Sequence, residues 1–405
     1  MCANPEQTLG AAPRFALPIV SACSAGQNAD APGQLSAPAA ADDRPGKLEL
    51  QLTNIWQRVL NRPSIGLTDN FFELGGHSLL ALQLFAAIEK EITGGAKVPL
   101  ALLLKAPTVA QLADALRHEG WSDAWSPLVV IKSGAPGKTP LFLVHAAGGN
   151  VLVYQDLARK LAVDQPVYGL QSQGLDGVQP LQSSVAEMAA LSIREIQSVQ
   201  PQGPYLLGGY CMGGTIALEM AQQLKAQGHE VALLALFETY NWSHIGAESL
   251  FDQIYFWVQK IEFHWRNFLL LNRTQKRTFF SEKLEALKSR SHIWRGVLRA
   301  QLGRNADAKS QHDVALAALW NNNDAVSLAY RASNFDGALV LIKAMKEYAI
   351  YKRPGLDLAA LAQQGATVHT LPVYPAGMLV EPFVDHLAAA LQASLNHAQG
   401  AETLG

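Results

Sequence analysis

A cysteine between two glycines is the residue of this 405-residue chain best suited to covalent chemistry. Cys211 is the central residue of Gly209-Tyr210-Cys211-Met212-Gly213, which has the G-x-S-x-G spacing of a nucleophile elbow with a thiol in place of the hydroxyl. In such an elbow, a sharp turn between a buried strand and a helix raises one side chain above the edge of the sheet. The turn also points a backbone N–H at the oxyanion of the reaction. Cys211 is therefore expected to attack a carbonyl group and hold the acyl group as a thioester.

The residues on either side of these glycines have the patterns that an elbow requires. Residues 204–208 form a short apolar run typical of a buried strand, and residues 215–225 have the apolar spacing of a helix that stops at Gly228. A buried structural cysteine among glycines is the alternative interpretation. The flanking strand and helix favour the nucleophile.

A serine close to the start of the chain is the second candidate for covalent chemistry. Ser78 follows the stretch Asp69-Asn70-Phe71-Phe72-Glu73-Leu74-Gly75-Gly76-His77 and precedes Leu79-Leu80. The two glycines before it and the helical spacing after it predict an exposed hydroxyl at the start of a helix, within reach of a modifying enzyme. Ser78 as a plain helix cap is the alternative, and it leaves the surrounding residues unexplained.

The composition changes along the chain and predicts two domains. Residues 1–46 are rich in Ala, Pro, Gly, Ser and Asp, which indicates a flexible linker. Residues 47–119 are expected to form a small four-helix bundle, from helical patterns over 48–60, from Ser78 onward and over 108–118. A second linker is expected over 119–125. Residues 127–400 are expected to form the larger domain.

The larger domain alternates apolar strands with helices. Such strands predict a mostly parallel sheet covered by helices on both faces. Residues 241–336 interrupt the alternation with a helical, aromatic-rich stretch, which predicts a lid; an ordinary helical subdomain is the alternative. The expected strands are 128–131, 141–144, 167–170, 204–208, 231–237 and 367–371.

The composition excludes several classes of protein. The chain is 49% hydrophobic and 16% charged with a formal charge of −2, which gives no sign of a nucleic-acid-binding surface. Three cysteines do not make a disulfide framework, and no apolar run is long enough to span a bilayer. No signal peptide, membrane association or metal site is expected. A cytoplasmic monomer is the expectation.

The motif around Ser78 and the larger domain both resemble parts of nonribosomal peptide synthetases. The Ser78 motif resembles the phosphopantetheine attachment site of peptidyl carrier proteins. From about residue 127 onward the chain resembles the terminal thioesterase domains of these synthetases, which have the α/β-hydrolase fold. That resemblance rests on the elbow, on Leu141-Phe142-Leu143-Val144-His145-Ala146-Ala147-Gly148-Gly149 and on Leu236-Phe237-Glu238-Thr239-Tyr240. It implies upstream synthetase modules, a phosphopantetheinyl transferase and a peptidyl substrate as partners.

The resemblance also implies roles for individual residues. Ser78 would carry a 4'-phosphopantetheine arm, and Cys211 would take the acyl group from that arm. The backbone N–H groups of Met212 and Ala147 would form the oxyanion hole. Glu238 falls at the position of the acid, and its side chain is one methylene longer than the aspartate more common there. His145, beside the oxyanion loop, is interpreted mainly as a structural hydrogen-bonding residue.

The chain departs from the family at the histidine that should serve as the base. Pro375 falls at the expected position, and proline cannot accept a proton. His244, six residues after Glu238, is the first candidate for a relocated base, because the loop that carries it could fold back over the sheet edge. His264 on the lid is a second candidate, and a site without a histidine base is the third. His369 and His386 are interpreted as structural.

Cysteine in place of serine bears on the product. A free thiol has a pKa of about 8.5 and asks less of its base than a hydroxyl does. An acyl group on sulfur also stays activated, which suits a difficult next step. Cysteine at this position resembles the thioesterases that form β-lactam or β-lactone rings, so intramolecular release to a monobactam-type lactam or a β-lactone is predicted. The alternatives are hydrolytic release, macrocyclisation, a degenerate carrier-binding domain, or a Cys211 engineered in place of serine.

Overall fold

The structure is a computed structural model that describes residues 46–117, 126–272, 276 and 308–400, apart from residues 77, 97, 178, 246–248, 273–275 and 376. The linker predicted over 1–46 lies outside the described residues, apart from Gly46. The second predicted linker, 119–125, also lies outside them.

The first domain is a small helical bundle, as the sequence predicts. Its helices are α1 (Lys47–Leu60), α2 (Ser78–Glu91), α3 (Leu102–Lys105) and α4 (Val109–Arg117). Their apolar faces meet in one core, in which the rings of Trp56 and Phe71 pack edge to face with centroids 5.2 Å apart. The short α3 has no helical spacing of its own that would predict it from sequence.

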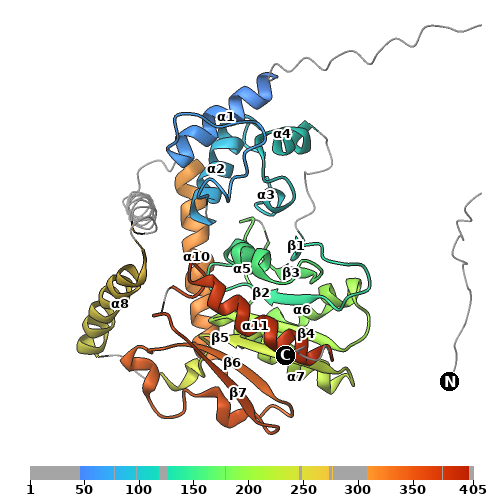
Figure 1. The fold of residues 1–405 in the computed structure, drawn as a ribbon, viewed down its shortest axis with the longest axis vertical. Coiled ribbons are helices and arrows are strands. Elements are labelled where there is room, and N and C mark those ends of the chain that lie inside the picture. The colour runs from blue at the N-terminus through green and yellow to red at the C-terminus, as the bar shows by residue number, and fades with distance from the viewer. Residues whose placement is uncertain are drawn as a thin grey trace, which may run out of the picture. The chain divides into compact units, whose positions relative to one another are not determined.

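The second domain contains a seven-stranded sheet in the order β1-β3-β2-β4-β5-β6-β7 (Figure 1). β1 runs antiparallel to β3, and the other neighbouring strands are parallel. This is the mostly parallel sheet of the α/β-hydrolase fold. The strands are β1 (Leu128–Lys132), β2 (Leu141–Val144), β3 (Val167–Leu170), β4 (Tyr205–Tyr210), β5 (Val231–Phe237), β6 (Leu339–Ala344) and β7 (Ala366–Leu371).

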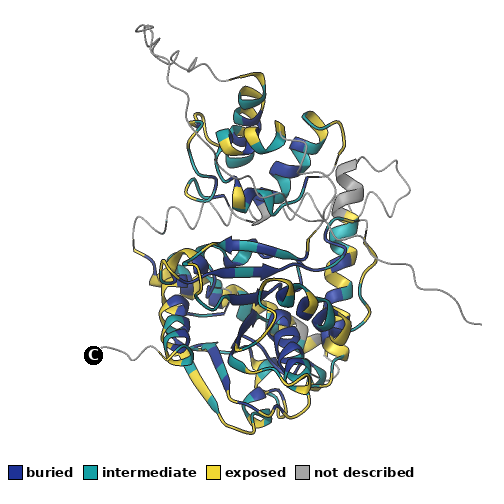
Figure 2. Cartoon of the chain, turned by 90° about the vertical axis from the view of Figure 1, so that its right-hand side faces the viewer, coloured by how far each residue is buried: buried dark blue, intermediate teal, exposed yellow. Residues whose placement is uncertain are grey.

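Helices cover the sheet on both faces and create two apolar cores, which appear as the dark blue interior in Figure 2. α5 (Gln155–Lys160) and α11 (Val384–Ala398) supply apolar side chains to one core. α6 (Val185–Val199) and α7 (Met212–Ala226) supply them to the other. Burial on both faces explains why the central strands are continuous apolar runs.

The structure differs from the sequence prediction at two places in this domain. β6 (Leu339–Ala344) is a seventh strand that the prediction misses, because it comes after the long helical stretch and contains the charged Lys343. α7 begins at Met212 and not at residue 215, because the elbow passes into the helix without a loop.

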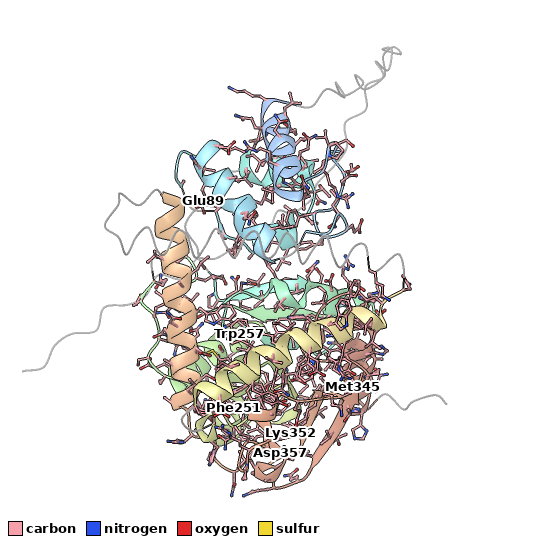
Figure 3. All side chains as sticks on the ribbon, turned by 90° about the vertical axis from the view of Figure 1, so that its left-hand side faces the viewer. Glu89, Phe251, Trp257, Met345, Lys352 and Asp357 are labelled. Atoms are coloured by element: carbon pink, nitrogen blue, oxygen red, sulfur yellow. The ribbon has the colours of Figure 1, made fainter. Side chains whose placement is uncertain are left out.

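The predicted lid is helical in the part that the structure describes. It contains the short helix η2 (Trp242–His244), α8 (Leu250–Leu270) and α10 (Ala308–Ala329); residues 277–307 lie outside the description. A capping box between Ser249 and Asp252 starts α8. Large apolar side chains of α8 are exposed, and Figure 3 shows two of them, Phe251 and Trp257.

Candidate active site

Cys211 lies at a sharp turn where β4 ends and α7 begins, as the elbow predicts. Its backbone has φ 56° and ψ −121°, a conformation that non-glycine residues rarely adopt. Its N–H donates to Phe237 O at 2.9 Å, and its carbonyl oxygen accepts from Gly214 N–H at 3.1 Å and from Thr239 Oγ1 at 3.2 Å. Hydrogen bonds from β4, α7 and the end of β5 therefore hold the strained turn in place.

Two glycines of the motif are required by close packing. A Cβ on Gly213 would lie 2.3 Å from Val144 O at the end of β2, and a Cβ on Gly209 would lie 2.3 Å from the backbone carbon of Gly213. No larger residue fits at either position without moving backbone. The two glycines thus let α7 start directly against the ends of β2 and β4.

A buried tyrosine joins the same two strand ends. The Tyr154 hydroxyl donates to Val144 O at 2.7 Å and accepts from the backbone N–H of Tyr210 at 2.8 Å. Tyr154 is fully buried, and burial raises the pKa of its hydroxyl, so it stays protonated. It fixes the oxyanion strand relative to the elbow, a role that nothing in its sequence context predicts.

The loop that carries Ala147 is held by α10. The buried Asn323 side chain donates from Nδ2 to Ala147 O at 3.0 Å. The Trp320 ring lies against Gly148, where a Cβ would come within 3.2 Å of it. Helix α10 therefore contacts the loop of Ala147 and Gly148 directly. Asn323 is a site residue that the sequence analysis missed, because it lies 176 residues from its partner.

The Cys211 side chain is half-buried, with apolar side chains and acidic groups nearby. It packs beside an apolar cluster that includes Tyr240, Trp242 and Leu356. Burial raises the pKa of the thiol to about 12, a hydrogen bond from the backbone N–H of Met212 opposes this rise, and the charges of Asp324 and Glu238 add to it. None of these influences on the thiol's pKa comes from an imidazole or a cation among the described residues.

Glu238 lies at the end of β5, where the sequence predicts the acid. Its carboxyl is buried; Oε1 accepts from the Ala344 N–H at 2.5 Å, and Oε2 accepts from the Tyr240 hydroxyl at 3.3 Å. Burial raises the pKa of Glu238 to about 7, against the lowering effect of these two hydrogen bonds, while the nearby Glu347 raises it further. The carboxyl is therefore rigidly held and about half protonated at neutral pH.

The structure does not join the first candidate base to Cys211 or to Glu238. His244 is exposed in η2, with Nδ1 3.2 Å from Ser243 Oγ and its ring against Gly355. To act as the base it would have to leave these contacts. The other candidate, His264, lies on α8 and is half-buried.

His145 and the residue at the family's histidine position are both structural here. His145 is buried, its Nδ1 lies 2.8 Å from Ala146 O, and burial lowers its pKa to about 4, so it is neutral. Pro375 lies in the loop after β7. Asn267 of α8 donates to Tyr374 O at 3.1 Å and to Pro375 O at 3.4 Å. The loop in which the sequence analysis places the expected base thus contacts α8.

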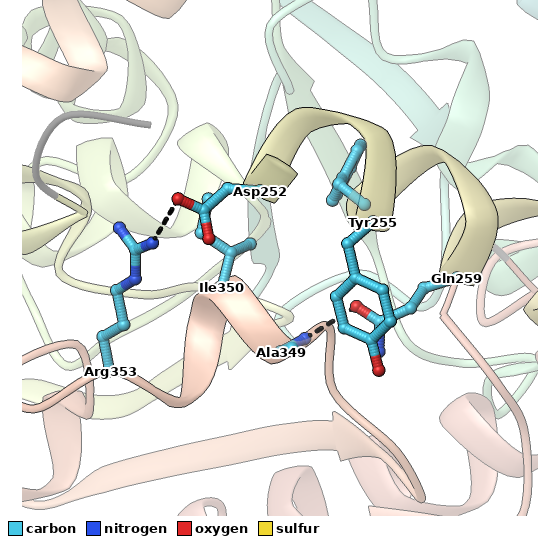
Figure 4. Close-up of a pocket in the computed structure, with 7 residues that line it drawn as sticks. Asp252, Tyr255, Gln259, Ala349, Ile350 and Arg353 are labelled. Atoms are coloured by element: carbon cyan, nitrogen blue, oxygen red, sulfur yellow. Dashed lines mark hydrogen bonds and ion pairs between the residues drawn. The ribbon is translucent and has the colours of Figure 1, made fainter. Parts of the chain in front are cut away.

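A small pocket marks another contact of α8 and does not include Cys211 (Figure 4). In it, Arg353 pairs with Asp252 at 2.9 Å and the Ala349 N–H donates to Gln259 Oε1 at 2.9 Å. Both contacts join α8 to the segment around η3 (Ala349–Lys352). They anchor the lid helix beside the residues that follow β6.

Two glycines shape the chain just before α2. α2 begins at Ser78, directly after the two glycines and His77. Gly75 has φ +91°, and a Cβ on Gly76 would lie 2.3 Å from the Phe71 ring. Both positions therefore need glycine to bring the chain to the helix start.

Two family models match separate parts of the chain. Residues 51–116 match the family model "Phosphopantetheine attachment site", and residues 139–253 match the model "Thioesterase domain". The chain therefore contains a carrier domain for covalently attached 4'-phosphopantetheine, followed by a thioesterase domain with the α/β-hydrolase fold.

Parts of the chain are similar to much longer synthetases. The dimodular nonribosomal peptide synthase of Bacillus subtilis is 40% identical over 189 residues, which are 47% of this chain and 8% of that protein. Malpibaldin synthetase of Mortierella alpina is 38% identical over 211 residues, 52% of this chain and 4% of that protein. The chain thus spans a small part of these relatives.

A solved structure supports the fold. The chain is similar to a four-domain nonribosomal peptide synthetase crystallised in its holo form with AMP and glycine, with a TM-score of 0.54 and 24% identity over 89% of this chain and 27% of that one. Among the described residues, no helix is long and apolar enough to cross a membrane, and no group of three His, Cys, Asp or Glu side chains is arranged to hold a metal ion.

Proposed function

We propose that this chain is the terminal carrier and thioesterase part of a nonribosomal peptide synthetase, and that it releases its product by ring closure. The peptidyl group reaches Ser78 from upstream modules, on an arm added by a phosphopantetheinyl transferase. It passes to Cys211 as a new thioester. The observation that supports this most is the strained Cys211 turn, with the Met212 N–H at the sulfur.

The oxyanion hole is proposed from the Ala147 and Met212 backbone N–H groups. Three features support it: the Tyr154 bridge, the close packing at Gly213 and the hydrogen bond from Asn323 fix the two backbones that carry these donors. Donors held in place before the reaction stabilise the developing negative charge without reorganisation. Glu238 is proposed as the acid of the site, and His244 stays a proposal for its base.

The product is proposed to be a strained lactam. Transfer between two thioesters is nearly isoenergetic, so the acyl group on Cys211 keeps its activation for the closing step. Apolar side chains around the thiol reduce the competing hydrolysis. A four-membered lactam needs an amine on the β-carbon of the last residue, which a 2,3-diaminopropionyl residue supplies. A seryl residue would give a β-lactone.

One observation favours a second function, that of a domain that binds the loaded carrier without catalysis. A thiol with a pKa of about 12 is almost wholly protonated at neutral pH, and a thiol is a weaker nucleophile than a thiolate. Transfer of an acyl group from Ser78 to Cys211 separates the two functions, because only the catalytic one requires it.

The test uses the whole chain, loaded on Ser78 with a peptide that ends in 2,3-diaminopropionate. Digestion and mass spectrometry are expected to find the acyl group on the peptide that contains Cys211, with the arm on Ser78 returned to its free thiol, and a released product lighter than the linear acid by one water. Cys211→Ala should keep the acyl group on the arm of Ser78. A linear acid as sole product would indicate hydrolysis, and no adduct on Cys211 would indicate the binding domain.

A further inference from the structure

Helix α10 crosses the site from the oxyanion loop to η2. Near its middle, Trp320 lies against Gly148 and Asn323 is hydrogen-bonded to Ala147 O. Just beyond its end, Arg331 donates to Ser243 O of η2 at 2.9 Å. Both of these contacted segments adjoin Cys211. The loop of Ala147 and Gly148 is the proposed oxyanion loop, and apolar residues between 240 and 245 pack beside the thiol. The stretch of α10 between them therefore passes the sulfur.

Asp324 lies in that stretch. It follows Trp320 by four residues, so both side chains lie on one side of the helix. The charge of Asp324 raises the pKa of the Cys211 thiol more than the charge of Glu238 does, which agrees with a position close to the sulfur. Asp324 is exposed and has no hydrogen bond or ion pair with another described residue. Its carboxylate is therefore open to a bound acyl group.

The carboxyl of Glu238 is not open to a bound acyl group in this structure. Both of its oxygens are engaged, one by the Ala344 N–H and one by the Tyr240 hydroxyl, and its carboxyl is buried. Tyr210 and Tyr154, the other titratable groups coupled to the thiol, are held protonated by burial. Partial burial raises the pKa of the Asp324 carboxyl, and among the described groups that act on the thiol Asp324 alone is exposed.

We propose that the Asp324 carboxylate is the proton acceptor for the group that attacks the acyl–Cys211 thioester, an inference that rests on the proposed function. The substrate nitrogen bonds to the thioester carbon and gives its proton to Asp324. The C–Sγ bond then breaks, and the sulfur leaves with the bonding electrons. It takes the proton from Asp324, which restores the thiol and the carboxylate. Protonation matters here because a sulfur in this environment is a poor leaving group as a thiolate.

The experiment compares wild type, D324N, D324E, H244A and a control, E230Q, in the full chain. Glu230 is an exposed carboxylate that precedes β5, at the opposite end of the parallel strands from Cys211. Each protein is loaded on Ser78 with the 2,3-diaminopropionyl peptide, and intact mass follows the decay of the Cys211 adduct. Iodoacetamide labelling of Cys211 between pH 7 and 10 is measured separately.

In D324N, decay of the adduct is expected to slow by about 100-fold or more, the scale of losing a general base. Labelling at a given pH should become faster, because a negative charge near the sulfur is gone. A purely structural role would not produce this opposite pair of changes. D324E should recover part of the decay rate, and E230Q should match wild type.

Three results would overturn the proposal. They are decay in D324N within about threefold of wild type, a labelling profile unchanged by D324N, and loss of decay in H244A with D324N unaffected. If D324N unfolds, D324E and D324S are measured in its place, with the melting temperature of E230Q as reference. Failure of the proposed function looks different, because wild type itself would then form no adduct on Cys211.

Discussion

The side-chain amide of Asn323 is 3.0 Å from the carbonyl oxygen of Ala147, and it places a lid helix in direct contact with the loop proposed to bind the oxyanion. Asn323 is completely buried, and its Oδ1 has no hydrogen-bond partner among the described residues. A buried amide that is only half satisfied costs stability. Its position at this loop suggests that the cost is kept for function.

Removal of the amide should weaken catalysis. We expect Asn323→Ala to lower kcat by about 10- to 100-fold with little change in KM, since the loss of one oxyanion donor costs about 100-fold or more and misplacement costs less. Asn322→Ala is the matched control, because Asn322 donates to Gln182 O at 2.9 Å on the same helix. Equal kcat in the two variants would contradict a special role for Asn323. Single-turnover transfer from loaded Ser78 gives the rate constant of acyl transfer in each of the two variants.

The Tyr154 hydroxyl should stabilise the domain. Tyr154→Phe leaves both Val144 O and the Tyr210 N–H without their buried partner, so we expect a loss of about 3 kcal/mol in the free energy of unfolding. Tyr168→Phe is the control, since the Tyr168 hydroxyl has no hydrogen bond to another described residue. Calorimetry of the two variants gives the comparison. Similar melting temperatures would show that the bridge contributes little.

The parts of this site that lie close together in sequence could be predicted from it. The elbow, the start of α2 and the acid position each depend on a few adjacent residues whose types are fixed locally, as the close packing at Gly76 and Gly213 shows. The sheet follows from apolar runs, although β6 was missed because it follows the long helical stretch and contains Lys343. Local pattern and local packing agree at these places.

The contacts made by the lid could not be predicted. Asn323 and Asp324 lie in a helix with an ordinary polar sequence, and only the path of α10 across the site brings them to Ala147 and Cys211. His244 shows the converse. Its spacing from Glu238 permits a base, but the conformation of η2 directs its ring to Ser243 and Gly355. Side-chain direction in a short loop depends on tertiary packing that spacing does not encode.

The reactivity of Cys211 should show how little the described site activates it. With a pKa of about 12, its labelling by iodoacetamide at pH 8 should be about 100-fold slower than that of the same cysteine in the urea-unfolded chain. The rate should rise about tenfold per pH unit up to pH 10, since it follows the thiolate fraction. A plateau near pH 7 would mean that a cationic group lies at the sulfur. Peptide mapping separates Cys211 from Cys2 and Cys23.

Glu238 should make the stability of the thioesterase domain depend on pH. Its pKa is about 7 in the folded chain and 4.5 as the ordinary value, so between these values the folded state binds more protons than the unfolded state. The free energy of unfolding therefore falls as pH rises from 4.5 to 7, by about 3 kcal/mol in total, and the contribution is fully present only below pH 4.5.

Glu238→Gln removes this titration and keeps an oxygen that can accept from the Ala344 N–H. The difference in melting temperature between wild type and the variant should shift in favour of the variant as pH rises from 4.5 to 7, and should change little above pH 8. Glu230→Gln, at an exposed site, should show no such trend. A difference that stays constant across this range would mean that Glu238 titrates near its ordinary pKa, and that its hydrogen bonds to Ala344 and Tyr240 offset the effect of burial.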